Sequence, residues 1–317
     1  MKLSLVGSFI LAVAGAGFGF FYSSFAEVGN TPAMAQLAGD QSVVKQRADD
    51  APKIPAIPTQ QKTATPILND ANNHWSATSL ATALKRSSSY RLFVQDALRK
   101  PEKGGVLYAQ SVVFACTKAS DALSGIPQAS TPKRDAILAE FKTHCDITLD
   151  QFNAQLRAQP NTQERDPLFA MMNDLASNQP EIRKKALAEA LKTQDPMLLF
   201  ETAALSFSRR VAPNGEGGVE KVLTYFNGQW LDEGDSAPFR YAQKLAACDF
   251  GLPCQQNDVW LNTLCVTANE CASSRQEYMA RFVYPNQPQW QSRIEQYRAA
   301  ITAAVKSQSV AAFVPGK

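Results

Sequence analysis

The sequence predicts an all-α fold, a helical bundle or an irregular array of short α-hairpins that is stapled by disulfides. Apolar residues recur at spacings of three and four along much of the chain, which is the pattern of amphipathic helices. Thr131-Pro132, Asp166-Pro167 and Asp195-Pro196 each place an N-cap residue before a proline, as helix starts commonly do. We find no convincing run of alternating strand residues, and the chain holds six cysteines.

The helical domain is expected to span residues 73–310, followed by a tail at 311–317. Its first helix ends before Pro101 and carries the apolar stripe Tyr90, Phe93, Val94, Ala97 and Leu98. A second helix is expected from Val106 to about Lys118, another after Pro180, and further helices at 239–248 and 258–265. A long C-terminal helix is marked by Trp290, Ile294, Tyr297, Ile301 and Val305. The glycine-rich stretch 214–218 is the strongest internal loop signal, so we expect any subdomain break near 213–218.

Residues 1–26 form a membrane-targeting segment, because one lysine precedes an uncharged apolar run from Leu3 to Tyr22. Two fates stay open: a signal peptide cleaved after Ala35, or an uncleaved anchor, which the length of the run favours. The next basic residue is Lys45, so the positive-inside tendency places the rest of the chain outside the cytoplasm. Residues 27–72, rich in proline and glutamine, are interpreted as a disordered linker. We therefore expect a periplasmic domain, either anchored in the inner membrane or released by signal cleavage.

All six cysteines are predicted to form disulfides: Cys116, Cys145, Cys248, Cys254, Cys265 and Cys271. An exported chain with an even number of cysteines favours cross-links, and the spacing in 248–271 suits neither a zinc module nor a redox motif. Cys116 is expected to pair with Cys145, because each lies near the end of a predicted helix.

Three pairings remain open for the other four cysteines. We favour Cys248–Cys265 with Cys254–Cys271, which would join helix to helix and loop to loop. Neighbour pairing, Cys248–Cys254 with Cys265–Cys271, is the second option. Cys248–Cys271 with Cys254–Cys265 is the third.

The residues that carry chemistry are sparse, and we assign no catalytic residue, metal site or cofactor. The only two histidines, His74 and His144, leave catalytic triads and histidine-rich zinc sites unsupported. Glu201 lies in an apolar helix, as a buried general acid would, but a carboxylate on the helix surface is the favoured interpretation. The acidic stretch from Trp230 to Asp235 suits a sugar or a cation, although a solvated loop is favoured. A net charge of +3 without a basic block argues against nucleic-acid binding.

A family resemblance rests on Ala97-Leu98, on the stretch from Gly104 to Ala109, on Cys116, and on the late Gly251-Leu252-Pro253-Cys254. Together these resemble uncharacterised exported helical proteins of proteobacteria that carry a late four-cysteine cluster. The resemblance covers roughly residues 85–300. It implies an all-α, disulfide-bonded fold with no known activity, and it supplies no catalytic residues.

We expect a non-catalytic binding or structural module of the bacterial envelope, which recognises an envelope protein or a cell-wall component. The alternative is a carboxylate-dependent hydrolase of peptidoglycan or another glycan. A concave pocket that holds two acids about 5–10 Å apart would favour the hydrolase.

Overall fold

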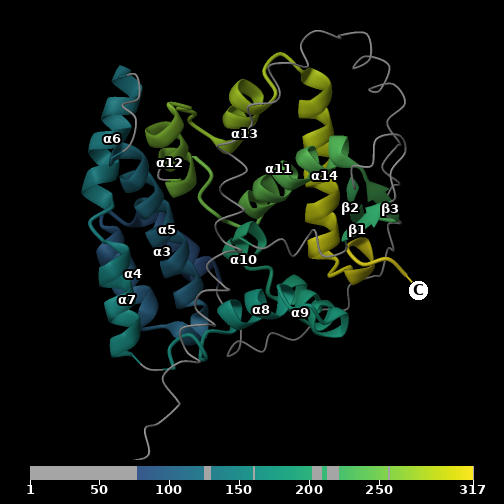
Figure 1. The fold of residues 1–317 in the computed structure, drawn as a ribbon, viewed down its shortest axis with the longest axis horizontal. Coiled ribbons are helices and arrows are strands. Elements are labelled where there is room, and N and C mark those ends of the chain that lie inside the picture. The colour runs from purple at the N-terminus through teal and green to yellow at the C-terminus, as the bar shows by residue number, and fades with distance from the viewer. Residues whose placement is uncertain are drawn as a thin grey trace, which may run out of the picture. The chain divides into compact units, whose positions relative to one another are not determined.

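The computed structural model describes residues 77–124, 130–159, 161–201, 209–212, 221–255 and 258–316. These residues belong to one compact unit, Ile54–Lys317. The predicted signal or anchor at 1–26, the linker at 27–72 and the break near 213–218 lie outside the described residues. Helices dominate the described part, which confirms the all-α prediction (Figure 1).

The chain begins with the helices α3 (Ala77–Arg86), α4 (Tyr90–Leu98) and α5 (Gly105–Ser124), with the short 3₁₀ turn η2 (Pro101–Lys103) before α5. All five residues of the predicted α4 stripe are buried. Gly104 has a φ of 81°, and a Cβ atom on Gly105 would lie 1.8 Å from the carbonyl oxygen of Ala97. The two glycines therefore allow α5 to start directly against the end of α4.

The three predicted proline caps open helices where the sequence places them. They start α6 (Pro132–His144), α8 (Pro167–Leu175) and α10 (Pro196–Glu201). The capping oxygens of Thr131, Asp166 and Asp195 accept backbone N–H groups at 3.3, 2.9 and 2.8 Å. The predicted helix after residue 179 is α9 (Pro180–Thr193). Helix α7 (Leu149–Ala158), which begins with a Thr148–Gln151 capping box, was not predicted.

A small antiparallel sheet corrects the expectation that strands are absent. It comprises β1 (Arg209–Ala212), β2 (Lys221–Phe226) and β3 (Gln229–Leu231) in the order β1-β2-β3. The β2–β3 turn is Asn227-Gly228, and both residues have positive φ, 48° and 87°. Asn-Gly is the preferred pair for such a hairpin turn. The signal was therefore present in the sequence, but the flanking strands are too short to show clear alternation.

The C-terminal part consists of α11 (Glu233–Asp249), α12 (Val259–Ala268), α13 (Arg275–Tyr278), the π-helical turn η4 (Met279–Val283), α14 (Pro288–Lys306) and the 3₁₀ turn η5 (Val310–Ala312). Helices α11 and α14 pack along each other. Helix α11 begins well before the predicted 239–248, because Asp232 caps it and Pro238 is accommodated inside it.

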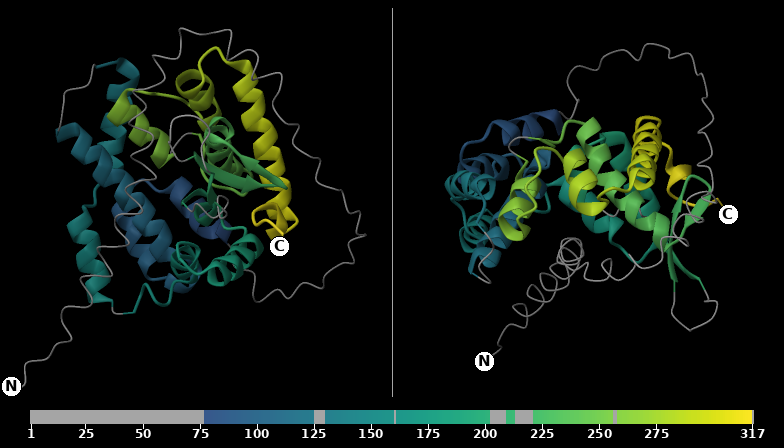
Figure 2. Two further views of the ribbon diagram at one scale, coloured as in Figure 1. Left: turned by 45° about the vertical axis from the view of Figure 1, so that its right-hand side comes forward. Right: turned by 90° about the horizontal axis from the view of Figure 1, so that it is seen from above.

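An aromatic cluster joins the sheet to these helices. Phe226 lies 4.8 Å from Phe239, 6.4 Å from Tyr297 and 5.4 Å from Phe313, measured between ring centroids. Figure 2 shows the sheet beside the C-terminal end of the chain in both views. There the backbone N–H of Asn227 donates to the carbonyl oxygen of Ala312 at 2.7 Å. Phe313 is fully buried. The expected tail at 311–317 therefore begins inside the core, and a boundary at residue 310 is too early.

Candidate functional site

The six cysteines form three disulfides, and none is free. Cys116 pairs with Cys145, as predicted, with a Cα–Cα distance of 5.5 Å. The favoured pairing of the other four was wrong, because Cys248 bonds Cys254 and Cys265 bonds Cys271. Disulfides of this number indicate that the chain folds in an oxidising compartment.

The reason for neighbour pairing lies in how the two helices end. After α11 the chain reverses at Gly251, with a φ of 101°, and after α12 it reverses at Asn269, with a φ of 59°. Left-handed residues at helix C-termini turn the chain back on the last helical turn. Each following cysteine is thereby returned to the cysteine six residues before it. Sequence spacing alone did not reveal these reversals.

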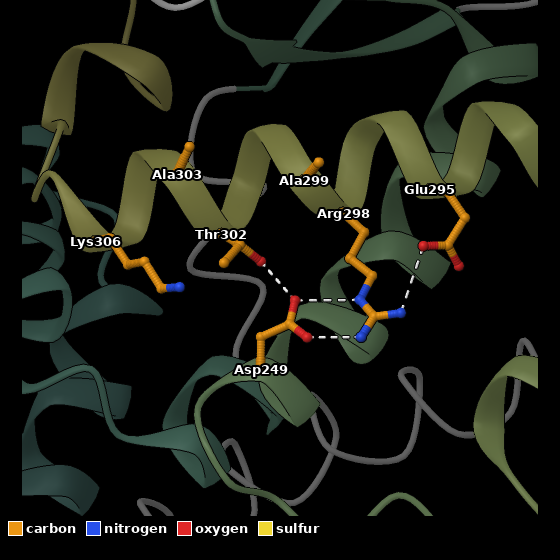
Figure 3. A pocket seen from close by; sticks show the side chains of 7 residues that line it. All are labelled: Asp249, Glu295, Arg298, Ala299, Thr302, Ala303 and Lys306. Carbon is orange, nitrogen blue, oxygen red and sulfur yellow. Dashed lines mark hydrogen bonds and ion pairs between the residues drawn. The ribbon is translucent and has the colours of Figure 1, made fainter. Parts of the chain in front are cut away.

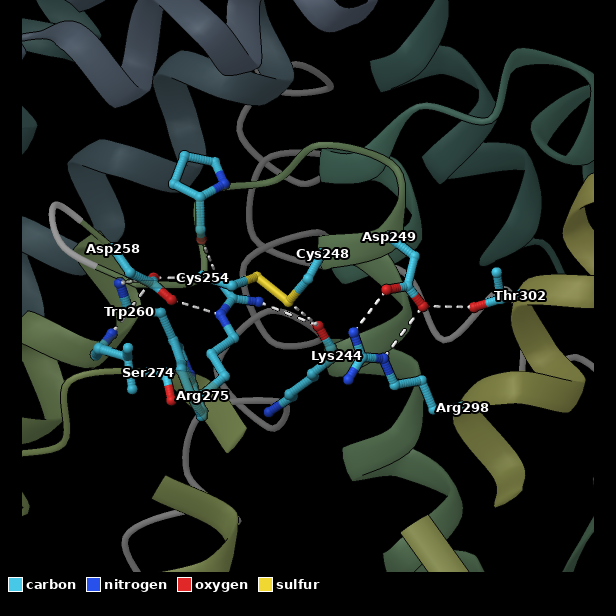
Figure 4. Close-up of a disulfide and its surroundings, with 12 residues drawn as sticks. Lys244, Cys248, Asp249, Cys254, Asp258, Trp260, Ser274, Arg275, Arg298 and Thr302 are labelled. Atoms are coloured by element: carbon cyan, nitrogen blue, oxygen red, sulfur yellow. Dashed lines mark hydrogen bonds and ion pairs between the residues drawn. A yellow bond between two sulfur atoms is a disulfide. The ribbon is translucent and has the colours of Figure 1, made fainter. Parts of the chain in front are cut away.

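A buried ion pair lies beside the Cys248–Cys254 disulfide (Figure 4). The Arg275 guanidinium donates from Nε to Asp258 Oδ2 at 2.5 Å and from Nη2 to Oδ1 at 3.1 Å. Both residues are at most 2% exposed. Asp258 also accepts the backbone N–H groups of Trp260 and Leu261 as the N-cap of α12. Its carboxylate is thus occupied by four donors, which is how a buried charge is tolerated.

The same guanidinium links several segments of the domain. It donates to the carbonyl oxygens of Lys244 and Pro253 at 3.3 and 3.4 Å, and the Arg275 backbone N–H donates to Cys254 O at 3.1 Å. Its Cζ lies 4.3 Å from the ring centroid of Phe200 and 5.2 Å from that of Trp260. These contacts are cation–π interactions. We call Arg275, Asp258, Trp260 and Phe200 the arginine centre.

A cavity of about 20 Å³ adjoins the arginine centre. Its wall includes Ser111, Leu252 and Pro253 together with apolar side chains of α3, α10 and α12. A space of this size holds roughly one water molecule. It does not admit a sugar ring.

Glu201 lies at the end of α10, next to the arginine centre. It is partly buried and accepts a hydrogen bond from the Ser111 hydroxyl. Burial raises the pKa of the Glu201 carboxyl, while the Ser111 bond and the charges of Lys244, Arg275 and Lys118 act to lower it. The favoured interpretation of Glu201 as a carboxylate on the helix surface was therefore wrong. Ser111 is ninety residues away in the sequence, so no local pattern marked this contact.

Two further acids, Asp166 and Asp195, anchor the start of α5 to other helices. Asp166 accepts the N–H groups of Val106 and Leu107 at 2.6 and 3.2 Å, in addition to capping α8. Asp195 accepts the Tyr108 hydroxyl at 3.2 Å. Burial raises the pKa of both carboxyls, that of Asp195 to about 6. The sequence predicted the caps but not these long-range bonds.

The acidic stretch 230–235 has structural roles. Asp232 caps α11 by accepting the Asp235 N–H at 3.2 Å. Asp235 forms a two-point ion pair with Arg293, at 3.0 and 3.1 Å. The stretch therefore spans the end of β3 and the start of α11, and the solvated-loop interpretation was wrong.

Of the two histidines, only His144 lies within the described residues. His144 is partly buried, with its ring 5.6 Å from that of Tyr90 and its Nδ1 atom 4.0 Å from Glu140. It is the last residue of α6. His74 lies outside the described residues.

A shallow groove of about 430 Å³ runs along the outer face of α14 (Figure 3). It is lined by Asp249, Glu295, Arg298, Ala299, Thr302, Ala303 and Lys306. Arg298 binds both oxygens of Asp249 at 2.6 and 3.1 Å and also contacts Glu295 at 3.4 Å. Partial burial opposes ionisation of Asp249, but hydrogen bonds from Arg298 and Thr302 outweigh it and lower the pKa of this carboxyl. Both acids of the groove are thus paired with one arginine.

The residues of the described ranges contain no group of three or more histidine, cysteine or acidic side chains placed to hold a metal ion. Within the same ranges, no helix combines the length and the apolar character needed to cross a bilayer.

The fold and the cross-links define a disulfide-stapled all-α protein. Comparison of the chain with protein-family models, curated proteins and solved structures yields no match.

Proposed function

We propose that this chain is an exported protein of the bacterial envelope, tethered to the inner membrane by its N-terminal segment. Its helical domain acts in the periplasm as a non-catalytic binding module for a cell-wall component or an envelope protein. Export is supported by the three disulfides, which require an oxidising compartment, and by the apolar run at the N-terminus.

The observation that carries the non-catalytic proposal is the role of the interior carboxylates. Asp166, Asp195 and Asp258 each cap a helix and also bind a second partner far away in the sequence. A general acid or base must exchange a proton with a substrate that it can reach. These three buried carboxylates accept structural hydrogen bonds, and the cavity beside Asp258 measures only about 20 Å³, so they do not meet that requirement.

The groove along α14 is our candidate for the binding face. It carries two acids and two bases, Asp249, Glu295, Arg298 and Lys306, around a floor of exposed alanines, Ala299 and Ala303. A groove with equal numbers of acids and bases fits a ligand that carries both amino and carboxyl groups better than it fits a ligand whose charges all have one sign. The peptide part of the cell wall has this chemistry, and so does an extended segment of a protein.

The alternative, a carboxylate-dependent glycan hydrolase, has one observation in its favour. Burial raises the pKa of Glu201, and a raised pKa is what a general acid of a glycosidase needs. The nearby Asp258, however, is fixed by Arg275 and by the start of α12.

Zymography on purified cell wall separates the two functions. The oxidised full chain is compared with Glu201→Gln and with the matched control Glu189→Gln, an exposed residue of α9. We expect no clearing by any of the three proteins. Clearing by the wild type and the control that Glu201→Gln abolishes would establish the hydrolase and overturn the proposal.

A further inference from the structure

We propose that Cys248–Cys254 is a thiol–disulfide exchange site, which a dithiol reductant opens while the other two disulfides stay joined. Opening it releases the segment 249–253 and uncovers Trp260 of the arginine centre. This inference concerns regulation of the domain and does not depend on its ligand.

Accessibility distinguishes this disulfide from the other two. Cys248 and Cys254 are both partly exposed, whereas Cys265 and Cys271 are 0% and 6% exposed. The third disulfide is mixed, because Cys145 is partly exposed but Cys116 is only 3% exposed. A thiolate must reach a sulfur atom along the S–S axis to displace the other sulfur. Attack on Cys145 would have to expel Cys116 as a thiolate in a buried position, which disfavours the charged form. Cys248–Cys254 is therefore the one disulfide of the three in which both cysteines are accessible to solvent.

The loop that this disulfide closes also covers the arginine centre. Pro253 O and Cys254 O accept hydrogen bonds from Arg275 at 3.4 and 3.1 Å. Leu252 is 6% exposed and lines the small cavity beside Trp260. Figure 4 shows the disulfide between the end of α11 and the Arg275 side chain. The loop and the arginine centre are thus in direct contact.

The surroundings of the two cysteines determine which sulfur is the better leaving group. Cys248 lies in the last turn of α11, and its sulfur is 3.8 Å from the carbonyl oxygen of Lys244. The partial negative charge at a helix C-terminus disfavours a thiolate there. Cys254 lies beyond the last residue of α11, Asp249, and therefore outside the helix. Cys254 is therefore the better leaving group.

The exchange balances as a two-electron transfer. One thiolate of the reductant attacks Cys248 Sγ, the Cys248–Cys254 bond breaks, and Cys254 leaves with the bonding electron pair. The second thiolate of the reductant then attacks the reductant sulfur of the mixed disulfide and expels Cys248 as a thiolate. Each cysteine thiolate takes up one proton that the dithiol released. The reductant ends as a disulfide, and the protein gains two thiols.

Once the bond is open, the loop is held by hydrogen bonds and by the packing of Leu252 and Pro253. Arg275 keeps Asp258 and the Lys244 carbonyl, so the ion pair remains in place. The change is consequently confined to the loop and to the side chains beneath it. Trp260, 2% exposed when the disulfide is closed, becomes accessible to solvent.

The test uses the oxidised full chain under native conditions. It is titrated with dithiothreitol, quenched with an alkylating reagent and mapped by peptide mass spectrometry. We expect Cys248 and Cys254 to be alkylated at about a tenfold lower dithiol concentration than the other four cysteines. Joint reduction of all three disulfides, or earlier reduction of either Cys116–Cys145 or Cys265–Cys271, would overturn the exchange site.

A second measurement tests the uncovering of Trp260. The Cys248→Ser/Cys254→Ser double variant mimics the open state, and Trp260→Phe in each background isolates the fluorescence of this tryptophan. We expect acrylamide to quench Trp260 more strongly in the double variant than in the oxidised wild type, with unchanged helical circular dichroism. Equal quenching would refute the uncovering. If the double variant loses its helices, quenching in the selectively reduced wild type decides by the same comparison.

Discussion

Removal of the Arg275 side chain should be among the most damaging single changes in the domain. The Arg275→Ala variant leaves the Asp258 carboxylate, 1% exposed, without its counter-charge. It also removes four hydrogen bonds, two to Asp258 and one each to the carbonyl oxygens of Lys244 and Pro253, and the contacts with two aromatic rings. Breaking a buried ion pair by removing one partner costs about 3–5 kcal/mol. We expect a decrease of that size in the free energy of unfolding.

The matched control is Arg281→Ala, because Arg281 pairs with Glu277 on the surface and its side chain is 53% exposed. An exposed pair of this kind contributes about 0–1 kcal/mol. Urea unfolding, followed by circular dichroism with all three disulfides intact, compares the two variants. Arg275→Lys should lie between them, because it keeps the charge but loses the two-point contact. A loss for Arg275→Ala no larger than that for Arg281→Ala would show that the arginine centre does not hold the domain together.

Cys116→Ser should yield a single free thiol at Cys145 and cost about 3–4 kcal/mol in the chain-entropy model; a thiol that maps within 248–271 would contradict the pairing. Phe313→Ala should lower the free energy of unfolding by about 3–5 kcal/mol in urea unfolding. A loss below about 1 kcal/mol would show that Phe313 belongs to a tail and not to the core. Because the folded-state pKa of Asp195 is raised to about 6, folding takes up protons between pH 4 and 6, so this group's contribution to stability falls as pH rises through that window. Asp195→Asn should remove this part of the slope, and urea unfolding at several pH values that shows equal slopes for both proteins would refute it. Mass spectrometry of the mature N-terminus should find the uncleaved segment, whereas a chain that starts at Gln36 would refute the anchor.

The features that the sequence predicted are local ones. An N-cap residue and the proline after it act within one helical turn, so the starts of α6, α8 and α10 could be placed to the residue. The stripe on α4 likewise needs only helical periodicity. Local rules of this kind were enough to give the fold class.

The features that were missed depend on geometry beyond one turn. The pairing in 248–271 follows from the chain reversals at Gly251 and Asn269, and cysteine spacing does not encode such reversals. Glu201 is hydrogen-bonded to Ser111 in α5, ninety residues away, so no local sequence pattern contains both residues. Arg275 carried no sequence signal, because an arginine is ordinarily exposed. Its role in holding the domain together is visible only in the structure, where it lies beside Asp258 and is hydrogen-bonded to the disulfide loop.

The most direct test of the proposed function is incubation of purified cell-wall sacculi with the oxidised protein, followed by sedimentation and analysis of both fractions. We expect the protein to sediment with the sacculi and no soluble fragments to appear in the supernatant. Lys306→Glu, in the α14 groove, should reduce sedimentation, whereas Lys192→Glu, on α9, should leave it unchanged. Soluble wall fragments that disappear with Glu201→Gln would contradict the non-catalytic binding function and establish the hydrolase instead.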